Sequence, residues 1–163
     1  MSKQRVYITS GVSGSGKSTY IKNHNLHSVS TDEIVENYAK ENGFNYTEAF
    51  DKIQSKKLFG AINSIFFDNI IHNIKSGNDF VIDRTSLNSF TRKSLVELIR
   101  TNGDIEIVVV YFDIPKETII KRLRDREAKT GKGIPDFVIE KQFESFTRPT
   151  VDEGFDRLET IQS

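Results

Sequence analysis

The residues with the clearest chemical signature lie in one short segment near the N-terminus. Residues 11–18 read Gly-Val-Ser-Gly-Ser-Gly-Lys-Ser and match the pattern G-x-x-x-x-G-K-[ST] at every position. Glycines allow backbone N–H groups to curl around phosphate oxygens, and the start of a helix adds a favourable dipole. Lys17 would then neutralise β- and γ-phosphate oxygens, while the Ser18 hydroxyl would bind Mg²⁺. The motif therefore predicts a nucleotide site with Mg²⁺ as its cofactor.

Other segments decide which class of nucleotide-dependent protein this is. A guanine-specific GTPase carries an N-K-x-D segment after a late strand, and this sequence has none. A hydrolytic motor has a glutamate after its strand-end aspartate, whereas Asp83 is followed by Arg84. A phosphotransferase that uses ATP is therefore the leading prediction. Its predicted ATP and phosphate contacts are Gly11, Ser13, Gly14, Ser15, Gly16, Lys17, Ser18, Thr19 and Arg122.

Two aspartates are candidates for the acceptor side of the reaction. Asp32 follows a short strand, at the carboxyl edge of the sheet, where open α/β folds bind ligands. A carboxylate there could take the proton from an attacking hydroxyl, although aspartate is equally common as a helix N-cap. Asp83, at the end of the segment FVID, could hold Mg²⁺ through water or bind the acceptor. The alternative for Asp83 is a turn residue at the strand end.

Two arginines indicate a lid over the phosphates. Arg122 and Arg126 are four residues apart, so they share one helical face, and a glycine-containing loop follows them. An arginine that closes over a transferring phosphoryl group stabilises its charge and excludes water. We predict a small lid at about residues 122–136, with Arg126 as the catalytic arginine. The alternative is a solvated basic helix in which Asp125 and Glu127 are the ionic partners.

The elements that must position these residues alternate between strands and helices. Apolar and β-branched runs predict strands, and apolar residues at helical spacing predict helices. The predicted strands are 5–9, 27–30, 80–83 and 106–113. The predicted helices run from Lys17 onward, from an N-cap at Thr31 or Asp32 to about Lys40, from Tyr46 to about Ser76 as one long or broken helix, from Ser89 to about Thr101, from after Pro115 to about Glu127, and from Asp136 to about Phe146. This alternation predicts an α/β fold, a three-layer α/β/α sandwich with a parallel sheet. The phosphate-loop motif and the arginine segment add the expectation of a P-loop NTPase (kinase) fold with a small helical lid.

Composition limits the remaining choices. The chain of 163 residues is 36% apolar and has twelve phenylalanines, which suits one domain over residues 1–163. Cysteine is absent and there are three histidines, so any metal should be bound by oxygen. Lys+Arg and Asp+Glu balance at 23 each, which argues against a generally basic nucleic-acid surface. With no signal peptide and no apolar run of roughly 20 residues, we expect a cytoplasmic protein without a membrane partner.

Together these segments resemble the polynucleotide 5′-hydroxyl kinase family, of the phage and animal end-healing type. The matching pieces are GVSGSGKST, STDE with Asp32, VIDRTSLN with Asp83 and Asn88, the arginine segment, and IPDFVIEKQFESFTRPTVDEGFD. The resemblance implies that Asp32 is the general base and that Ser18 binds the metal. It implies that Lys17 and Arg126 stabilise the transition state. It also implies that the acceptor is a DNA or RNA 5′ end.

One departure from that family bears on the acceptor. In the phage-type enzymes an arginine three residues after the base holds the acceptor's phosphate, and Val35 stands at that position here. The predicted acceptor contacts are Asp83, Arg84, Asn88 and Arg92, with Arg84 or Arg92 replacing the missing arginine. Two other functions stay open. One is a kinase of a small molecule, a nucleoside or nucleotide, or a hydroxymethylated base in DNA; the other is a nucleotide-binding regulatory or toxin-like module.

Overall fold

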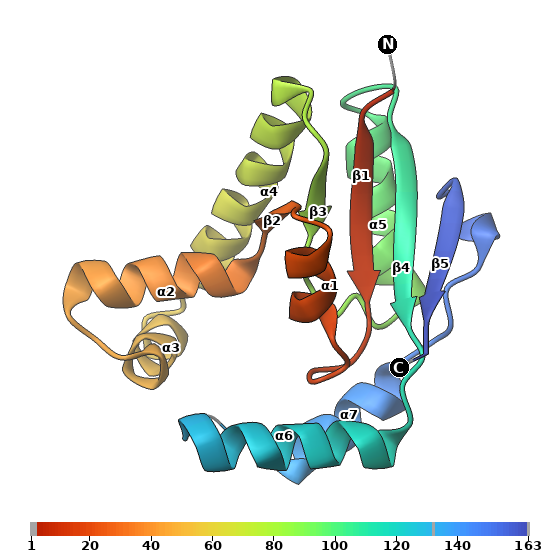
Figure 1. Ribbon diagram of the computed structural model, residues 1–163. Helices are drawn as coiled ribbons and strands as arrows, with labels where there is room; N and C mark the ends of the chain where they lie inside the picture. Colours follow the sequence, from red (N-terminus) through yellow and green to blue (C-terminus); the bar gives the residue numbers. More distant parts are fainter. Residues whose placement is uncertain (1–2, 132, 163) are drawn as a thin grey trace.

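A central parallel β-sheet forms the frame of the molecule (Figure 1). The computed structural model describes residues 3–131 and 133–162. The strands are β1 (Arg5–Ser10), β2 (His27–Val29), β3 (Phe80–Ile82), β4 (Glu106–Phe112) and β5 (Arg157–Ile161). They pair in the order β2-β3-β1-β4-β5, and every neighbouring pair is parallel. All carboxyl ends therefore meet at one edge, and the predicted parallel sheet is confirmed.

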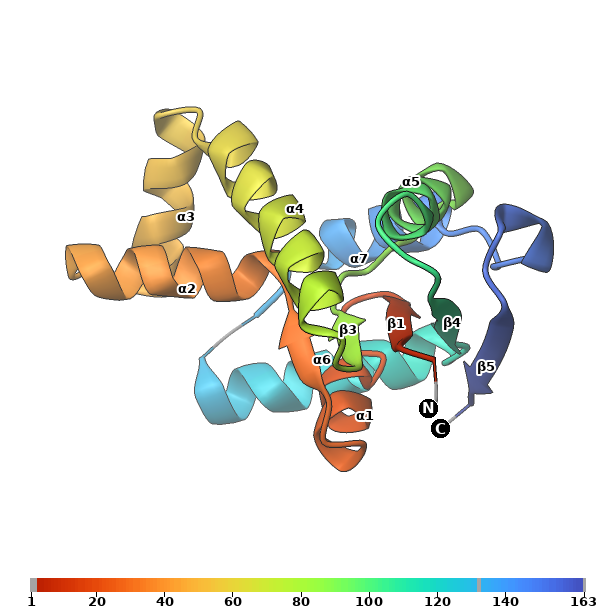
Figure 2. The same cartoon turned by 90° about the horizontal axis from the view of Figure 1, so that it is seen from above.

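Helices cover both faces of the sheet, so the fold has three layers (Figure 2). They are α1 (Lys17–Asn23), α2 (Thr31–Asn42), α3 (Tyr46–Ser55), α4 (Phe59–Ser76), α5 (Ser89–Arg100), α6 (Lys116–Thr130) and α7 (Asp136–Ser145), with a 3₁₀ turn at Val151–Glu153. Side chains alternate across β4, since Ile107 and Val109 join one buried cluster while Val108 and Val110 join the other. The predicted α/β/α sandwich is confirmed.

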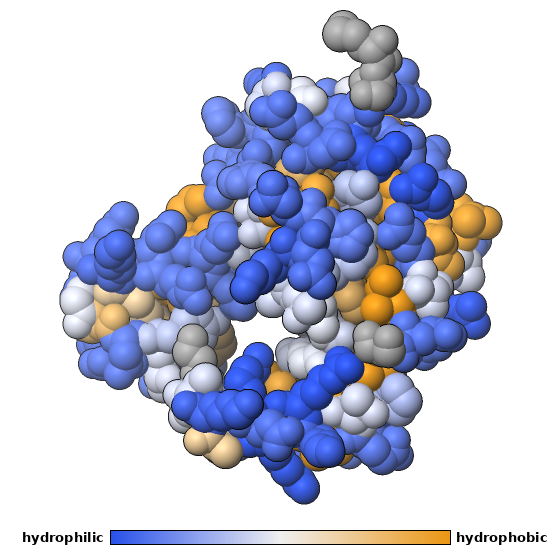
Figure 3. Space-filling model, viewed as in Figure 1, coloured by the Kyte–Doolittle hydropathy of each residue, from blue (hydrophilic) through white to orange (hydrophobic). Residues whose placement is uncertain are grey.

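The two clusters anchor different helices around the sheet. The first packs α2, α4 and α5 through residues such as Val35, Phe66 and Leu95. The second packs α1, α6 and α7 through Tyr20, Ile119 and Ile139. The surface is hollowed between the α2–α3 side and α6, as the space-filling view shows (Figure 3). Across residues 3–131 and 133–162, no helix combines the length and the apolar character needed to cross a membrane.

The start of α2 corrects one expectation. The Ser30 hydroxyl accepts a hydrogen bond from the Glu33 N–H at 3.2 Å and caps the helix. The prediction that Thr31 or Asp32 is the N-cap is therefore wrong, because serine is as good a cap and lies at the position where the backbone is still extended. Asp32 instead lies inside the first turn, where its carboxylate is free of the capping role.

The apolar stretch from Tyr46 to Ser76 is broken into two helices, one of the two predicted forms. Asn45 and Glu48 form a capping box that starts α3. Lys57 takes a φ of +56°, a left-handed conformation that ends helical continuity, and α4 begins two residues later. The break folds α3 back beside α2 (Figure 2).

The predicted lid contains more helix than the sequence suggests. Helix α6 runs to Thr130, three residues beyond the predicted end, and stops at Gly131, whose φ is +73°. The segment 122–136 thus consists of the last turns of α6, a short loop and the start of α7. Lys132 within it lies outside the described residues.

Candidate active site

The glycine-rich segment forms the turn between β1 and α1, as predicted. Gly16 has a φ of +104°, a left-handed conformation that favours glycine, and α1 begins at the next residue. Hydrogen bonds tie the end of β1 to the segment after β3: Thr9 Oγ1 donates to the Arg84 carbonyl (2.8 Å), Ser10 Oγ to the Ser86 carbonyl (2.9 Å) and the Gly11 N–H to the Thr85 carbonyl (2.9 Å). The loop is therefore fixed to the same strand end that carries Asp83.

Two of the loop glycines are also required by packing. A Cβ on Gly11 would lie 2.9 Å from the Phe112 Cβ, at the end of β4. A Cβ on Gly14 would lie 2.9 Å from the Leu123 side chain of α6, and Gly14 has a φ of +82° as well. The loop is thus held between the sheet edge and α6, so the helix that carries the predicted lid arginines touches the loop directly.

Lys17 lies inside the loop rather than in solvent. Its Nζ donates to the carbonyls of Gly11 at 2.9 Å and Val12 at 2.8 Å. Burial lowers the pKa of Lys17 to about 8, although the nearby carboxylates of Asp83 and Asp32 oppose the shift. The loop therefore holds a desolvated ammonium group, which an anion would stabilise.

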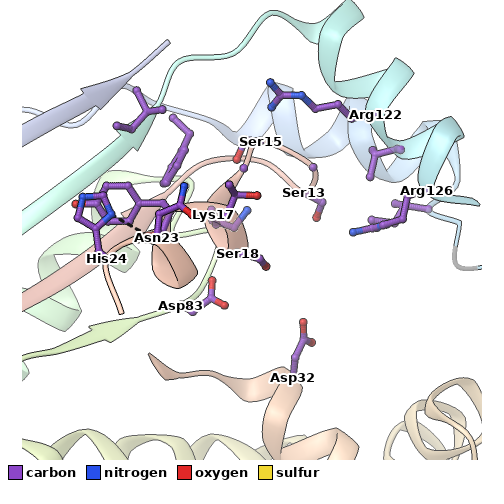
Figure 4. A pocket seen from close by; sticks show the side chains of 18 residues that line it. Ser13, Ser15, Lys17, Ser18, Asn23, His24, Asp32, Asp83, Arg122 and Arg126 are labelled. Atoms are coloured by element: carbon purple, nitrogen blue, oxygen red, sulfur yellow. Dashed lines mark hydrogen bonds between the residues drawn. The ribbon is translucent and has the colours of Figure 1, made fainter. Parts of the chain in front are cut away.

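A cavity of about 790 Å³ joins the loop to the residues predicted to act with it (Figure 4). Its lining contains every loop residue from Ser13 to Thr19, together with Asp32, Asp83, Arg122 and Arg126. In the view of Figure 4 the two arginines extend from α6 on one side, and the two aspartates come from the other side. These residues are far apart in sequence, and the fold brings them around one space.

The sequence interpretation missed residues at the other end of this cavity. Its lining also includes Tyr20, Asn23, His24, Phe112 and Ile161. His24 stacks on Tyr20 with ring centroids 3.9 Å apart, and Tyr20 meets Phe112 edge to face. The four-residue spacing of Tyr20 and His24 on one face of α1 is the signal that could have identified them.

Three oxygen-bearing side chains lie between this cavity and a second one of about 420 Å³. Ser18, Asp32 and Asp83 line both cavities. Asp83 is positioned by its N–H, which donates to the Val29 carbonyl at 2.9 Å, and burial raises the pKa of its carboxyl. Within the described residues there is no group of three or more His, Cys, Asp or Glu that could hold a metal. The donors present fit Mg²⁺, which commonly takes one or two protein oxygens and completes its shell with phosphate and water.

Asp32 has a partner that the sequence did not suggest. The Tyr46 hydroxyl, at the start of α3, donates to Asp32 Oδ1 at 2.8 Å. Burial and this hydrogen bond raise the pKa of Tyr46. Asp32 also lines both cavities, so its carboxylate is held by Tyr46 at the edge of the space that a ligand would fill.

The two predicted lid arginines are available for a ligand. No ion pair of Arg122 or Arg126 is found in the part of the chain that the structure describes, whereas Arg124 lies 3.7 Å from Asp136. A Cβ built on Gly16 would lie 3.8 Å from Arg122 Nη1, which places that guanidinium over the phosphate loop. The alternative of a basic helix paired with its own acidic residues is therefore not what the structure shows for these two arginines.

Arg92 is not a free acceptor contact, and this prediction is corrected. Its side chain is 0% exposed and forms an ion pair with Glu153, in which the Nε–Oε1 distance is 2.7 Å. Its remaining N–H groups donate to the carbonyls of Ser86 and Leu87, to Thr147 Oγ1 and to Glu153 Oε2. All five guanidinium donors are used inside the protein, so Arg92 holds the segment after β3 against the C-terminal region.

The other predicted acceptor residues are divided. Asn88 caps α5 by accepting from the Thr91 N–H at 2.8 Å, and it lines neither cavity. Arg84 stacks its guanidinium over the Phe66 ring, 4.8 Å from the centroid. Val35, on α2, is buried in the first hydrophobic cluster. Of the four predicted acceptor contacts, only Asp83 lines either cavity.

Comparison of the sequence with protein families gives one match that covers most of the chain. A family model described as an AAA domain matches residues 6–149. Among curated proteins, no sequence matches.

Solved structures similar to this chain include two that are named as kinases. A candidate kinase from Chloroflexus aurantiacus is 14% identical with a TM-score of 0.72, covering 99% of this chain and 86% of that one. A gluconokinase from Sinorhizobium meliloti is 19% identical with a TM-score of 0.55 (99% and 84% covered). The Pnkp1/Rnl/Hen1 complex is 21% identical with a TM-score of 0.56, over 75% of this chain and 40% of that one. These likenesses show a P-loop kinase-like fold.

Proposed function

We propose that this chain is a phosphotransferase, which moves the γ-phosphoryl group of ATP to a hydroxyl acceptor. The chain belongs to the AAA-domain family, whose model matches residues 6–149. One observation carries the proposal. The phosphate loop with Lys17, Arg122 and Arg126 of α6, and the carboxylates of Asp32 and Asp83 surround one cavity. A phosphate site alone would suit hydrolysis or simple binding, whereas a carboxylate facing it supplies what a hydroxyl acceptor needs.

In this reaction each side chain has a defined task. Asp32 accepts the proton of the acceptor hydroxyl while that oxygen forms a bond to the γ-phosphorus. The bond from the γ-phosphorus to the bridging oxygen breaks, and ADP leaves with the electron pair. Lys17 and Arg126 stabilise the negative charge on the phosphoryl oxygens as the group is transferred.

The residues present also fit the cofactor that such a reaction uses. Ser18 would hold Mg²⁺ through its hydroxyl, and Asp83 would act through a bound water. When bound, Mg²⁺ neutralises charge on the β- and γ-phosphates. The raised pKa of the Asp83 carboxyl is consistent with a partly desolvated anion that gains from a nearby cation.

We place the nucleoside of ATP at the far end of the cavity, beside Tyr20, His24 and Phe112. Stacked and edge-to-face rings there provide an apolar wall with polar edges, which suits a planar base. Asn23 adds an amide with both donor and acceptor capacity at the same end.

For the acceptor, one observation favours a small molecule without a phosphate of its own. The cavity beyond Asp32 is lined by four carboxylates, Asp32, Glu33, Glu36 and Asp83, and by one ammonium group, Lys22. These carboxylates would repel a phosphate on the acceptor. Arg92 cannot offset this repulsion, because it is buried in an ion pair with Glu153. A polynucleotide 5′-hydroxyl is the second candidate, supported by the resemblance of the C-terminal segment to the polynucleotide 5′-hydroxyl kinase family.

Transfer of labelled γ-phosphate tests the proposal. The protein is incubated with Mg²⁺ and ATP, and with 5′-hydroxyl DNA and RNA oligonucleotides, nucleosides, or neutral sugars and polyols in separate reactions. We expect label on a hydroxyl compound and little ATP consumption without one. Label only on oligonucleotides would favour the second candidate. Tight ATP binding with no transfer to any hydroxyl would contradict the proposal and favour a regulatory module.

Replacing Asp32 with asparagine should lower kcat about 10²-fold, in the range of a positioned proton transfer. Asparagine keeps an oxygen that can accept from Tyr46, but it cannot take a proton. Ser30 is the helix cap, so α2 and the melting temperature should be unaffected. The measurements are kcat on the identified acceptor, ATP affinity and thermal melting. A variant with wild-type kcat would refute the role of Asp32 as base.

ATP binding should take up a proton above about pH 8. The pKa of Lys17 is lowered to about 8 by burial, and bound phosphates should raise it again. Near pH 9, roughly one unit above this pKa, the free protein has lost most of that proton, so binding restores it. ATP affinity should therefore fall as pH rises above 8. Calorimetry in two buffers with different ionisation enthalpies measures the uptake, which should vanish in a Lys17→Met variant.

A further inference from the structure

We infer that Gln142 of α7 is a positioning residue for the phosphate loop. Its Oε1 accepts from the Ser13 N–H at 2.8 Å, and its Nε2 donates to Ser13 Oγ at 3.1 Å. The two residues are 129 positions apart in sequence, and both are half-buried. The inference rests on the proposed function only in that the loop is taken to bind ATP.

The two bonds are reciprocal and define one orientation of the Gln142 amide. An amide that accepts from a backbone N–H and donates to the hydroxyl of the same residue restrains both the main chain and the side chain there. Ser13 directly precedes Gly14, which has a left-handed backbone conformation. An unrestrained glycine can adopt many backbone conformations. The contact therefore restrains the main chain next to Gly14 before any ligand binds.

Gln142 is itself held in a fixed place. Ile139, one turn earlier on α7, is 1% exposed and packs in the same buried cluster as Val12 and Leu123. Two helices thus contact the loop. Leu123 of α6 packs against Gly14, and Gln142 of α7 is hydrogen-bonded to Ser13.

Preorganisation of this kind acts on binding more than on the chemical step. A loop already held in its binding conformation loses less conformational entropy when phosphate arrives. Restraint that is equal in the ground and transition states changes KM for ATP with little change in kcat. This pattern separates Gln142 from Arg126, which we expect to act mainly on kcat.

The test compares Gln142→Met, which keeps the length of the side chain but removes both bonds, with Ser13→Ala, which removes only the hydroxyl contact. We expect Gln142→Met to weaken ATP binding about tenfold, the size expected from one or two net hydrogen bonds, with kcat within about twofold. Ser13→Ala should have a smaller effect, and the double variant should be no weaker than Gln142→Met alone. Lys141→Met, an exposed neighbour on α7, is the matched control and should bind as the wild type does.

A second readout does not depend on ATP. In the nucleotide-free protein, the Ser13 amide should exchange its hydrogen more slowly in the wild type than in Gln142→Met, by about tenfold. Equal exchange rates in the two proteins would overturn the inference, as would additive losses of ATP affinity in the double variant. If the wild type bound no ATP, the proposed function would fail while the exchange experiment still decided whether Gln142 restrains the loop.

Discussion

A Lys17→Met variant should be folded and inactive, with phosphoryl transfer reduced below detection. The ammonium group of Lys17 is the one positive charge inside the loop itself, and backbone N–H groups cannot replace it at the β- and γ-phosphates. Methionine has nearly the same length, so it fills the same space without the charge. Labelled γ-phosphate transfer measures the loss, and direct binding of ATP should weaken in parallel.

Stability distinguishes loss of function from loss of fold in this variant. Burial lowers the pKa of Lys17 to about 8, which means that the folded protein disfavours its charged form. The unfolded chain binds this proton more tightly than the folded chain does. The Lys17 ammonium therefore lowers the free energy of unfolding at neutral pH. This destabilisation is relieved as the pH rises from 8 toward the ordinary lysine pKa. Removing the ammonium should leave the melting temperature unchanged or higher. A folded variant with near-normal turnover would contradict the assignment of the phosphate loop.

Local signals were sufficient for four of the five strands and for the turn that carries the phosphate loop, whereas β5 (Arg157–Ile161) was not among the predicted strands. The apolar runs at residues 5–9 and 106–113 are properties of adjacent residues, and both are strands as predicted, at Arg5–Ser10 and Glu106–Phe112. The break at Lys57 was left open because an exposed lysine carries no strong helix-ending signal, although its backbone takes a φ of +56°. The cap of α2 was misassigned because Ser30, Thr31 and Asp32 are all good caps, and one residue of register decides among them.

The site was less predictable where contacts join distant segments. The burial of Arg92 depends on Glu153, 61 residues away, and an isolated arginine near a strand end gives no sign of such a partner. The same holds for Tyr46 with Asp32 and for Gln142 with Ser13, which only the folded chain brings together. Motif spacing could therefore predict where the phosphate loop lies, whereas the surroundings of the predicted acceptor residues depend on long-range packing.

Removal of the Arg126 side chain should lower kcat about 10³-fold while ATP affinity falls only a few-fold. Arg126 lines the cavity from the last turns of α6, and it is exposed and without an ion pair among the residues described. Charge on the transferring group is greatest in the transition state, so an arginine at that point contributes more to the chemical step than to binding. Steady-state kinetics of Arg126→Ala, together with direct ATP binding, separate the two effects.

Two further variants make the Arg126 prediction specific. Arg124→Ala, on the same helix but directed toward Asp136, should retain wild-type kcat and ATP affinity. Arg126→Lys keeps the charge without the planar fork, so it should recover part of the lost turnover but not all of it. Equal losses of kcat and ATP affinity in Arg126→Ala would show an ordinary ground-state phosphate contact. In that case Arg122, whose guanidinium lies near Gly16 over the loop, would be the remaining candidate for the transition-state role.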